Sequence, residues 1–174
     1  MPTAEMSVPR IAVPVFDYRF QVPATVDAVA DFHFQTGILK SLSPPLMLLQ
    51  VHRFDPLAEG SIGDFTMWMG PVPVHWRAEH KNVSRAGFTD VQVAGPMKRW
   101  EHTHRFTAID ANTSEVHEHI EFEHHTGWRG IWSRMLFPKP ALLALFFWRS
   151  LVTRRAAAKI DRAARAARSA SREY

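Results

Sequence analysis

The amino-acid sequence predicts an α+β fold, in which a curved antiparallel sheet of about seven strands wraps around one long carboxyl-terminal helix. Three observations lead to this prediction. A strand-like alternation near the amino terminus is followed by two short helical stretches. Closely spaced turn signals then divide residues 46–124 into about six strands, and the last part of the chain has the composition of a long helix.

The first strand is expected over residues 16–22, where apolar and polar side chains alternate with the period of a half-buried strand. Pro23 then opens a stretch with apolar residues at three- and four-residue spacing, which ends at Gly37. A second short helix is expected to reach Leu42. The pair Pro44-Pro45 ends it, because proline lacks a backbone donor and forces its predecessor into extended geometry.

Five turn signals separate the strands that follow, and the short spacing indicates an antiparallel meander rather than βαβ units. These signals are Asp55-Pro56 with Gly60, Gly70-Pro71, Arg85-Ala86-Gly87, Gly95-Pro96 and Asp110-Ala111-Asn112.

The terminal helix is expected over residues 141–170, which contain no proline or glycine and would span ~45 Å. Residues 141–152 are rich in Leu, Phe and Trp, and we expect the sheet to grip them on almost every side, Phe147 included. From Arg154 onward the helix carries mainly alanines and bases, and we expect it to extend beyond the sheet.

The length and composition fit a single globular domain over residues 1–174, with an amino-terminal extension of residues 1–14 and a basic tail from about residue 160. Hydrophobic residues make up 46% and charged residues 22%, which excludes wholesale disorder. The chain has no cysteine, which excludes disulfides, cysteine-ligated zinc and a thiol nucleophile.

The net charge of +4 is concentrated at the carboxyl end. From Arg149 onward eight bases and two acids give +6, so the rest of the chain carries −2. The basic pI therefore gives no reason to expect nucleic acid as a partner of the whole domain. Arg155, Lys159, Arg162 and Arg165 form one cationic stripe. This stripe is either a solvated helix end or a weak contact with an anionic membrane surface or nucleic acid.

Targeting signals are not recognisable in the sequence. Prolines interrupt residues 1–16, and the longest apolar run, Ala141–Trp148, has eight residues, far below the ~20 of a membrane span. We therefore expect a cytoplasmic protein. The sequence also lacks the G-x-S-x-G, Walker and dinucleotide-binding motifs, so we expect no serine-hydrolase or nucleotide chemistry and no cofactor.

With this element order the chain resembles the START-like and polyketide-cyclase/dehydrase-like SRPBCC superfamily of helix-grip proteins, in particular its bacterial ligand-binding members. The resemblance covers residues 16 to about 159. It is carried by Val22-Pro23-Ala24, Phe32-His33, the segment from Leu42 to Pro45, and Phe88-x-Asp90-x-Gln92-x-x-Gly95-Pro96-x-x-x-Trp100-x-His102-x-His104-x-Phe106. Ala30 departs from the tryptophan expected in many relatives. The resemblance implies an apolar ligand cavity and no universal catalytic motif.

Two neighbouring strands place candidate polar residues inside. Trp100 and Phe106 mark the buried face of residues 99–107, so His102 and His104 share it. The parity of the following strand carries Glu118 inward, beside His104 if the hairpin pairs residues of like parity. The cluster either orients a carbonyl or hydroxyl of a ligand or forms a self-satisfied core network.

For other candidate site residues the alternation of the strand does not decide which face of the sheet the side chain lies on. Asp90 and Gln92 compete with Val91 and Val93 for the interior, so either pair fits. The motifs His102-x-His104 and His117-x-His119 suggest a metal site, but like parity sends the second pair to the opposite face, so no metal is expected. Apolar cavity walls are expected from Phe65, Met67, Trp76, Trp100, Phe106 and Phe147.

Two functions fit these observations. The first is binding of a hydrophobic or aromatic small molecule, lipid-like or polyketide-like, in an internal cavity. The alternative is a cyclase or dehydratase that removes a proton next to a carbonyl, with Glu118, His104 or His102 as the catalytic group. In the second case burial is expected to raise the pKa of Glu118 toward the useful range.

Overall fold

A computed structural model describes residues 13–45 and 47–171, and its architecture confirms the predicted fold. The expected extension at residues 1–14 lies almost entirely outside the described residues. The elements in chain order are β1 (Val15–Val22), α1 (Val26–His33), α2 (Ile38–Leu42), β2 (Leu48–Phe54), β3 (Ile62–Met69), β4 (Val72–Ser84), β5 (Gly87–Ala94), β6 (Arg99–Ala108), β7 (Ser114–Glu123), α3 (Gly127–Leu136) and α4 (Lys139–Ala170).

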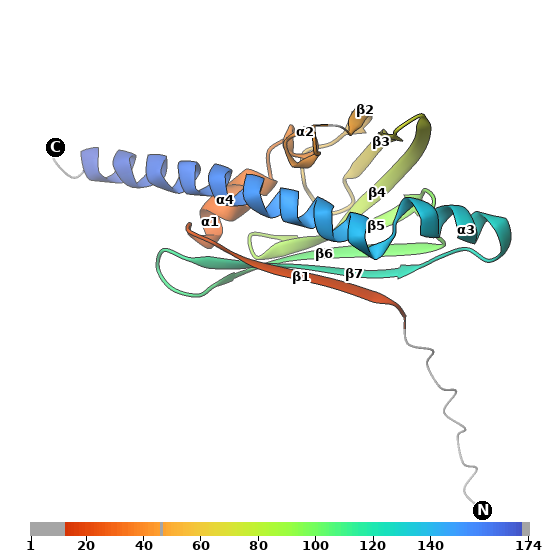
Figure 1. Ribbon diagram of the computed structural model, residues 1–174. Helices are drawn as coiled ribbons and strands as arrows, with labels where there is room; N and C mark the ends of the chain where they lie inside the picture. Colours follow the sequence, from red (N-terminus) through yellow and green to blue (C-terminus); the bar gives the residue numbers. More distant parts are fainter. Residues whose placement is uncertain (1–12, 46, 172–174) are drawn as a thin grey trace, which may run out of the picture.

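The seven strands form one antiparallel sheet in the order β1-β7-β6-β5-β4-β3-β2. The strands from β2 to β7 follow each other as a meander, and β1 closes the sheet beside the last strand. The helix α4 runs across one face of this sheet (Figure 1). In the pairing of β6 with β7, His104 lies opposite Glu118, as the parity argument predicts.

The amino-terminal helix α1 is tied to α4 by a polar contact at its first turn. Thr25 is the N-cap of α1, and its Oγ1 accepts a hydrogen bond from the Ala28 N–H. The same hydroxyl lies 2.9 Å from Oδ1 of Asp161 on α4 and donates to it. Because this contact joins residues 136 positions apart, it fixes the two helices against each other.

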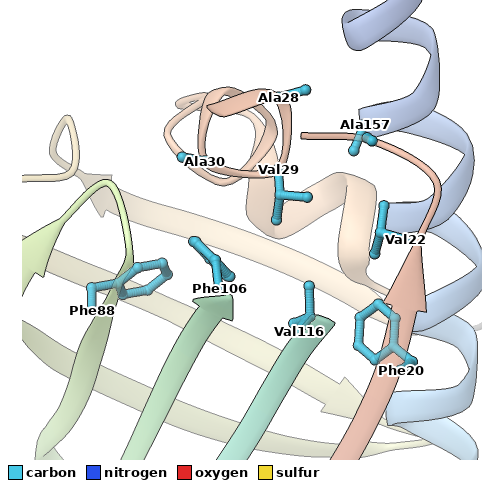
Figure 2. Close-up of a cluster of buried hydrophobic side chains, with 10 residues drawn as sticks. Phe20, Val22, Ala28, Val29, Ala30, Phe88, Phe106, Val116 and Ala157 are labelled. Atoms are coloured by element: carbon cyan, nitrogen blue, oxygen red, sulfur yellow. The ribbon is translucent and has the colours of Figure 1, made fainter. Parts of the chain in front are cut away.

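The main apolar core lies where α1 and α4 meet the sheet (Figure 2). Phe20, Phe106 and Val116 project from three neighbouring strands toward Val29 of α1. Phe106 is 3% exposed and belongs to this core. The prediction that Phe106 forms a wall of the ligand cavity is therefore wrong, because α1 covers that end of β6.

The helix α4 is buried along one stripe rather than on all sides, which corrects two predictions. Its buried residues recur at three- and four-residue spacing: Leu142, Phe146, Ser150, Thr153, Ala157, Ala158 and Asp161. Phe147 lies off this stripe and is 56% exposed, so it does not line the cavity. The buried stripe also passes Arg154 and reaches Asp161, because α1 packs on the second half of the helix.

The short helix α3 between β7 and α4 was not predicted from the sequence. It buries only Gly130 and Ser133, Leu136 is half-buried, and four large apolar side chains are exposed, namely Trp128, Ile131, Trp132 and Met135. Trp128, Trp132 and Leu136 line one side of a shallow pocket whose other side comes from the start of β4 and the β5–β6 connection. Among the described residues, no single helix is long and apolar enough to cross a membrane. Only α3 and α4 together, with a bend of 41° between them, pass such a test of length and composition.

Candidate functional site

A cavity of about 140 Å³ lies between the sheet and the helices α2 and α4. Aromatic and aliphatic side chains form most of its wall, including Phe54, Phe65, Met67, Trp76, Trp100, Phe137, Leu142 and Phe146. Polar side chains reach it from five elements, namely His33, His80, Asp90, His102, His104 and Arg149, and Gln35 adds an amide from the loop after α1. The site is therefore an apolar chamber with a polar group of histidines, one acid, one amide and one arginine.

His104 lies at the centre of the polar group, between two carboxylates. Its Nε2 lies 3.2 Å from Oδ2 of Asp90, and its Nδ1 lies 2.8 Å from Oε2 of Glu118. Burial by itself would lower the pKa of His104, but the charges and hydrogen bonds of Glu118 and Asp90 outweigh burial and raise this pKa to about 9. His104 is therefore an imidazolium near neutral pH.

Glu118 lies beneath the histidines and is 3% exposed. It is not part of the cavity wall, so a ligand in the cavity meets the histidines first. Burial favours a raised pKa for Glu118, but the imidazolium of His104 and the hydrogen bonds from His102 and His104 lower its pKa well below the usual value. The predicted upward shift is therefore wrong, and Glu118 is an ionised group that holds two imidazoles.

His102 is held in one orientation by Glu118, and its Nε2–H donates to Oε2 at 2.7 Å. Burial and the neighbouring charge of His104 lower the pKa of His102 to about 4. Among the described residues, the bond to Glu118 is the one hydrogen bond of this side chain, so its Nδ1 is without a partner. His102 is thus a neutral imidazole on the cavity wall with a free lone pair, oriented by a carboxylate as in many general bases.

Asp90 faces the cavity, whereas Gln92 does not, which settles the ambiguity of β5. Oδ1 of Asp90 lies 3.2 Å from Nε2 of His80, whose Nδ1 lies 3.0 Å from the Ser61 carbonyl oxygen. The side chain of Gln92 instead closes the β5–β6 turn, where its Nε2 donates to the Met97 carbonyl oxygen at 2.8 Å. Gln92 therefore has a structural role at the connection between β5 and β6.

Arg149 brings a positive charge to the opposite wall of the cavity, from α4. Its guanidinium lies over the Phe146 ring, 5.3 Å from the centroid. Among residues 13–45 and 47–171 it forms no salt bridge, and its Nε is buried without an acceptor. Burial lowers the pKa of Arg149, and the more distant charges of Glu118 and Asp90 oppose that effect. The cavity thus contains an arginine whose donors are available.

The remaining predicted wall residues lie where parity put them. Phe65, Met67, Trp76 and Trp100 all contribute to the cavity. Trp76 and Trp100 pack edge to face at 5.3 Å, and Phe137 contacts both rings at the end of the chamber next to α3.

Four polar cavity residues were missed in the sequence: His33, Gln35, His80 and Arg149. His80 shares the parity of Trp76 in β4 and was within reach of the same argument. Arg149 follows Phe146 by one helical turn, but an arginine near the end of an apolar run is normally expected to reach solvent. His33 donates from Nδ1 to the Val29 carbonyl oxygen, and burial lowers its pKa to about 4.

Three groups of side chains have a donor arrangement that suits a metal ion. Two of them share the cavity histidines: His33, His104 and Glu118, and Asp90, His102 and His104. The third, Asp17 with His117 and His119, lies on the other face of the sheet, as parity predicts for these two histidines. In the first two groups Glu118 and Asp90 pair with His104, whereas His33 and His102 bond to the Val29 carbonyl oxygen and to Glu118. In the third group both histidines pair with Asp17.

Comparison with known proteins finds similarity at the level of structure. No family model matches the chain, and no curated protein sequence does. The ZhuI aromatase/cyclase from Streptomyces sp. R1128 aligns with a TM-score of 0.63 at 14% identity, over 90% of this chain and 98% of that one. Norcoclaurine synthase from Thalictrum flavum, solved with dopamine and hydroxybenzaldehyde, aligns with a TM-score of 0.59 at 15% identity, over 87% and 96% of the two chains.

A protein from Thermus thermophilus also aligns, with a TM-score of 0.57 at 16% identity, over 87% of this chain and 99% of that one. At these identities the likeness concerns the fold, which all these chains share over nearly their whole length. The chain therefore has the helix-grip fold that its sequence predicts, and it shares this fold with these three proteins.

Proposed function

We propose that this protein binds an aromatic or otherwise apolar small molecule that carries an acidic or carbonyl oxygen at one end. The observation that carries the proposal is the cavity itself, whose wall is aromatic and aliphatic except for Gln35, Arg149 and the polar group around His104. Pockets of this kind bind the body of a ligand by apolar contact and fix its orientation through a few polar groups. The relatives in fold that act on aromatic compounds support the same proposal.

The size of the cavity narrows the ligand class. An apolar cavity of ~150 Å³ accommodates benzene, and this one measures about 140 Å³. It therefore fits a single aromatic ring as it stands. A lipid-like or polyketide-like ligand fits only if the walls move, and the adaptable side chain of Met67 and the short helix α2 are the elements that permit such movement.

Ligand binding is tested with the full chain. Native mass spectrometry after gentle purification detects a co-purified molecule, and a panel of single-ring aromatic acids and aldehydes, fatty acids and aromatic polyketides is then titrated against the fluorescence of Trp76 and Trp100. Ala78→Leu fills the cavity and should abolish binding, whereas Ala94→Leu at the exposed end of β5 should leave it intact. The proposal fails if no compound binds, or if Ala78→Leu binds like the wild type.

Arg149 provides a sharper test of the polar end. Arg149→Gln should weaken binding of an aromatic acid much more than binding of the corresponding neutral alcohol, because only the acid can accept a charge-assisted hydrogen bond. Equal effects on the acid and the alcohol would show that Arg149 does not contact the ligand's polar end.

A second function is favoured by one specific observation, the neutral His102 with its free Nδ1. We propose that in a bound ketone this nitrogen removes a proton from the carbon next to the carbonyl, while the charges of Arg149 and His104 stabilise the enolate oxygen. Glu118 keeps the imidazole in the required tautomer. This is the first step of the cyclase or dehydratase reaction expected from the sequence.

Proton exchange tests this step without knowledge of the natural substrate. The protein should accelerate deuterium incorporation next to the carbonyl of a bound aromatic ketone, as followed by NMR. His102→Asn should abolish the acceleration while it spares binding. His119→Asn, on the outer face of the sheet, is the matched control and should retain it. Exchange that persists in His102→Asn would remove this histidine from the mechanism, and binding without exchange would leave a binding protein.

A further inference from the structure

The helix α3 presents its large apolar side chains to solvent. Trp128 is 70% exposed, Ile131 60%, Trp132 49% and Met135 65%. We refer to these four residues as the α3 surface. Exposed apolar residues scattered singly need no explanation, but two tryptophans, an isoleucine and a methionine on consecutive turns of one helix form a patch of the kind that contacts another surface.

In α3 small residues are buried and large apolar residues are exposed, and this orientation has a local cause. The face that packs on the body of the protein consists of Gly130 and Ser133. A Cβ atom at Gly130 would lie 1.9 Å from the His125 carbonyl oxygen, so only glycine allows this close approach. Ser133 lies 2.7 Å from Nδ1 of His124, which fixes the rotation of the helix. The small residues therefore hold α3 with its large apolar residues turned outward.

The charged side chains of α3 and of the segment that follows it up to Ile160 have a single sign. Arg129, Arg134 and Lys139 are exposed, and they form no salt bridge within the described part of the chain. From His124 to Ile160 the sequence contains no aspartate or glutamate. An apolar helix face on a segment whose charged side chains are all basic is complementary to a surface that is apolar inside and anionic at its rim.

We propose that the α3 surface docks the protein onto an anionic lipid bilayer. Tryptophan is favoured at the boundary between headgroups and acyl chains, and the neighbouring bases are attracted to lipid phosphates. Leu143 and Phe147 of α4, the helix that follows α3, are exposed as well. Figure 1 shows α3 at the end of the molecule opposite the carboxyl terminus, so this contact differs from the basic stripe Arg155–Arg165 considered from the sequence.

Membrane docking through α3 does not depend on what the cavity binds, but it would place one wall of the cavity beside the bilayer. Phe137 directly follows α3 and forms the cavity wall against Trp76 and Trp100. A protein docked through α3 therefore holds this wall of the cavity next to the bilayer, where apolar molecules accumulate.

The test uses the full chain and vesicles of phosphatidylcholine with and without phosphatidylglycerol. The wild type should co-sediment with the anionic vesicles, and its tryptophan emission should shift to the blue. Trp128→Ser with Trp132→Ser should reduce the partition coefficient by about tenfold or more, and so should Ile131→Ser with Met135→Ser. The matched control is Leu48→Ser with Ile109→Ser, which removes two exposed apolar side chains elsewhere and should leave binding unchanged.

The bases are tested in the same assay. Arg129→Gln, Arg134→Gln and Lys139→Gln together should remove the preference for anionic vesicles and its sensitivity to salt. The proposal is overturned if the wild type does not bind vesicles or if the Trp128/Trp132 variant binds equally well. It is also overturned if sedimentation shows a dimer without lipid that the same variants disperse, since a second copy would then cover this surface.

Discussion

His104 and Glu118 face each other directly across β6 and β7, and the Nδ1 of the imidazole lies 2.8 Å from Oε2 of the carboxylate. Both side chains are almost completely buried. A buried ion pair does little for stability compared with apolar residues of the same size, but loss of one partner leaves the other charge uncompensated. The pair therefore makes the candidate site sensitive to single substitutions.

Glu118→Gln should destabilise the protein by about 3–5 kcal/mol, because His104 would retain its charge beside Asp90 alone or lose it altogether. Urea unfolding measures the effect. Glu115→Gln is the control, since Glu115 forms a surface pair with Arg19 at 2.9 Å and should contribute no more than ~1 kcal/mol. Equal losses in the two variants would contradict the buried pair.

The stability should fall on the alkaline side as His104 loses its proton. In the unfolded chain a histidine titrates near ~6.5, whereas His104 in the folded protein has a pKa of about 9. The protonated His104 therefore makes its full contribution to the free energy of unfolding below the pKa of the unfolded chain. This contribution, on the order of 3 kcal/mol, is lost as the pH rises to the pKa of the folded protein. Urea unfolding between these pH values measures the loss, which should be absent in His104→Gln.

The stability of the protein should also fall on the acid side, because two buried histidines are neutral in the folded state. His33 and His102 have pKa values lowered to about 4, so both stay neutral in the folded protein while the unfolded chain takes up protons. Their contribution is present above the unfolded pKa and is lost as pH falls toward 4. Maximum stability is thus expected near neutral pH. A thermal melting temperature that rises steadily from neutral to acid pH would contradict the two neutral histidines.

The site shows which parts of a structure a sequence can predict. The interior positions of Trp100, His102, His104 and Glu118 followed from parity, because a one-residue slip would turn apolar neighbours to solvent. In α4 no such rule applied. Residues 141–148 are all apolar, so their sequence has no period that distinguishes Phe146 from Phe147. Which of them is buried depends on how α1 and the sheet dock on the helix.

Phe146 and Phe147 therefore give a direct comparison of the two sides of α4. Phe146 is 1% exposed and packs on Phe16 and His102, whereas Phe147 is 56% exposed. Phe146→Ala should cost about 3–5 kcal/mol, because it removes buried apolar contacts and enlarges the cavity. Phe147→Ala should change the free energy of unfolding by less than ~1 kcal/mol. Equal costs would show that Phe147 is covered in solution.

Gly130→Ala should detach α3 from the body of the protein, because the added Cβ would overlap the His125 carbonyl oxygen, an atom of the backbone that cannot turn away. Gly37→Ala is the matched control. Its Cβ would meet no atom within 4 Å, and its φ of −87° suits alanine, so this variant should be neutral or slightly stabilising. Hydrogen exchange of residues 127–136 should speed up in Gly130→Ala and stay unchanged in Gly37→Ala. Because the rotation of α3 is set by Gly130, the first variant should also bind anionic vesicles differently from the wild type, and identical exchange and binding would show that the close approach at Gly130 does not hold the helix.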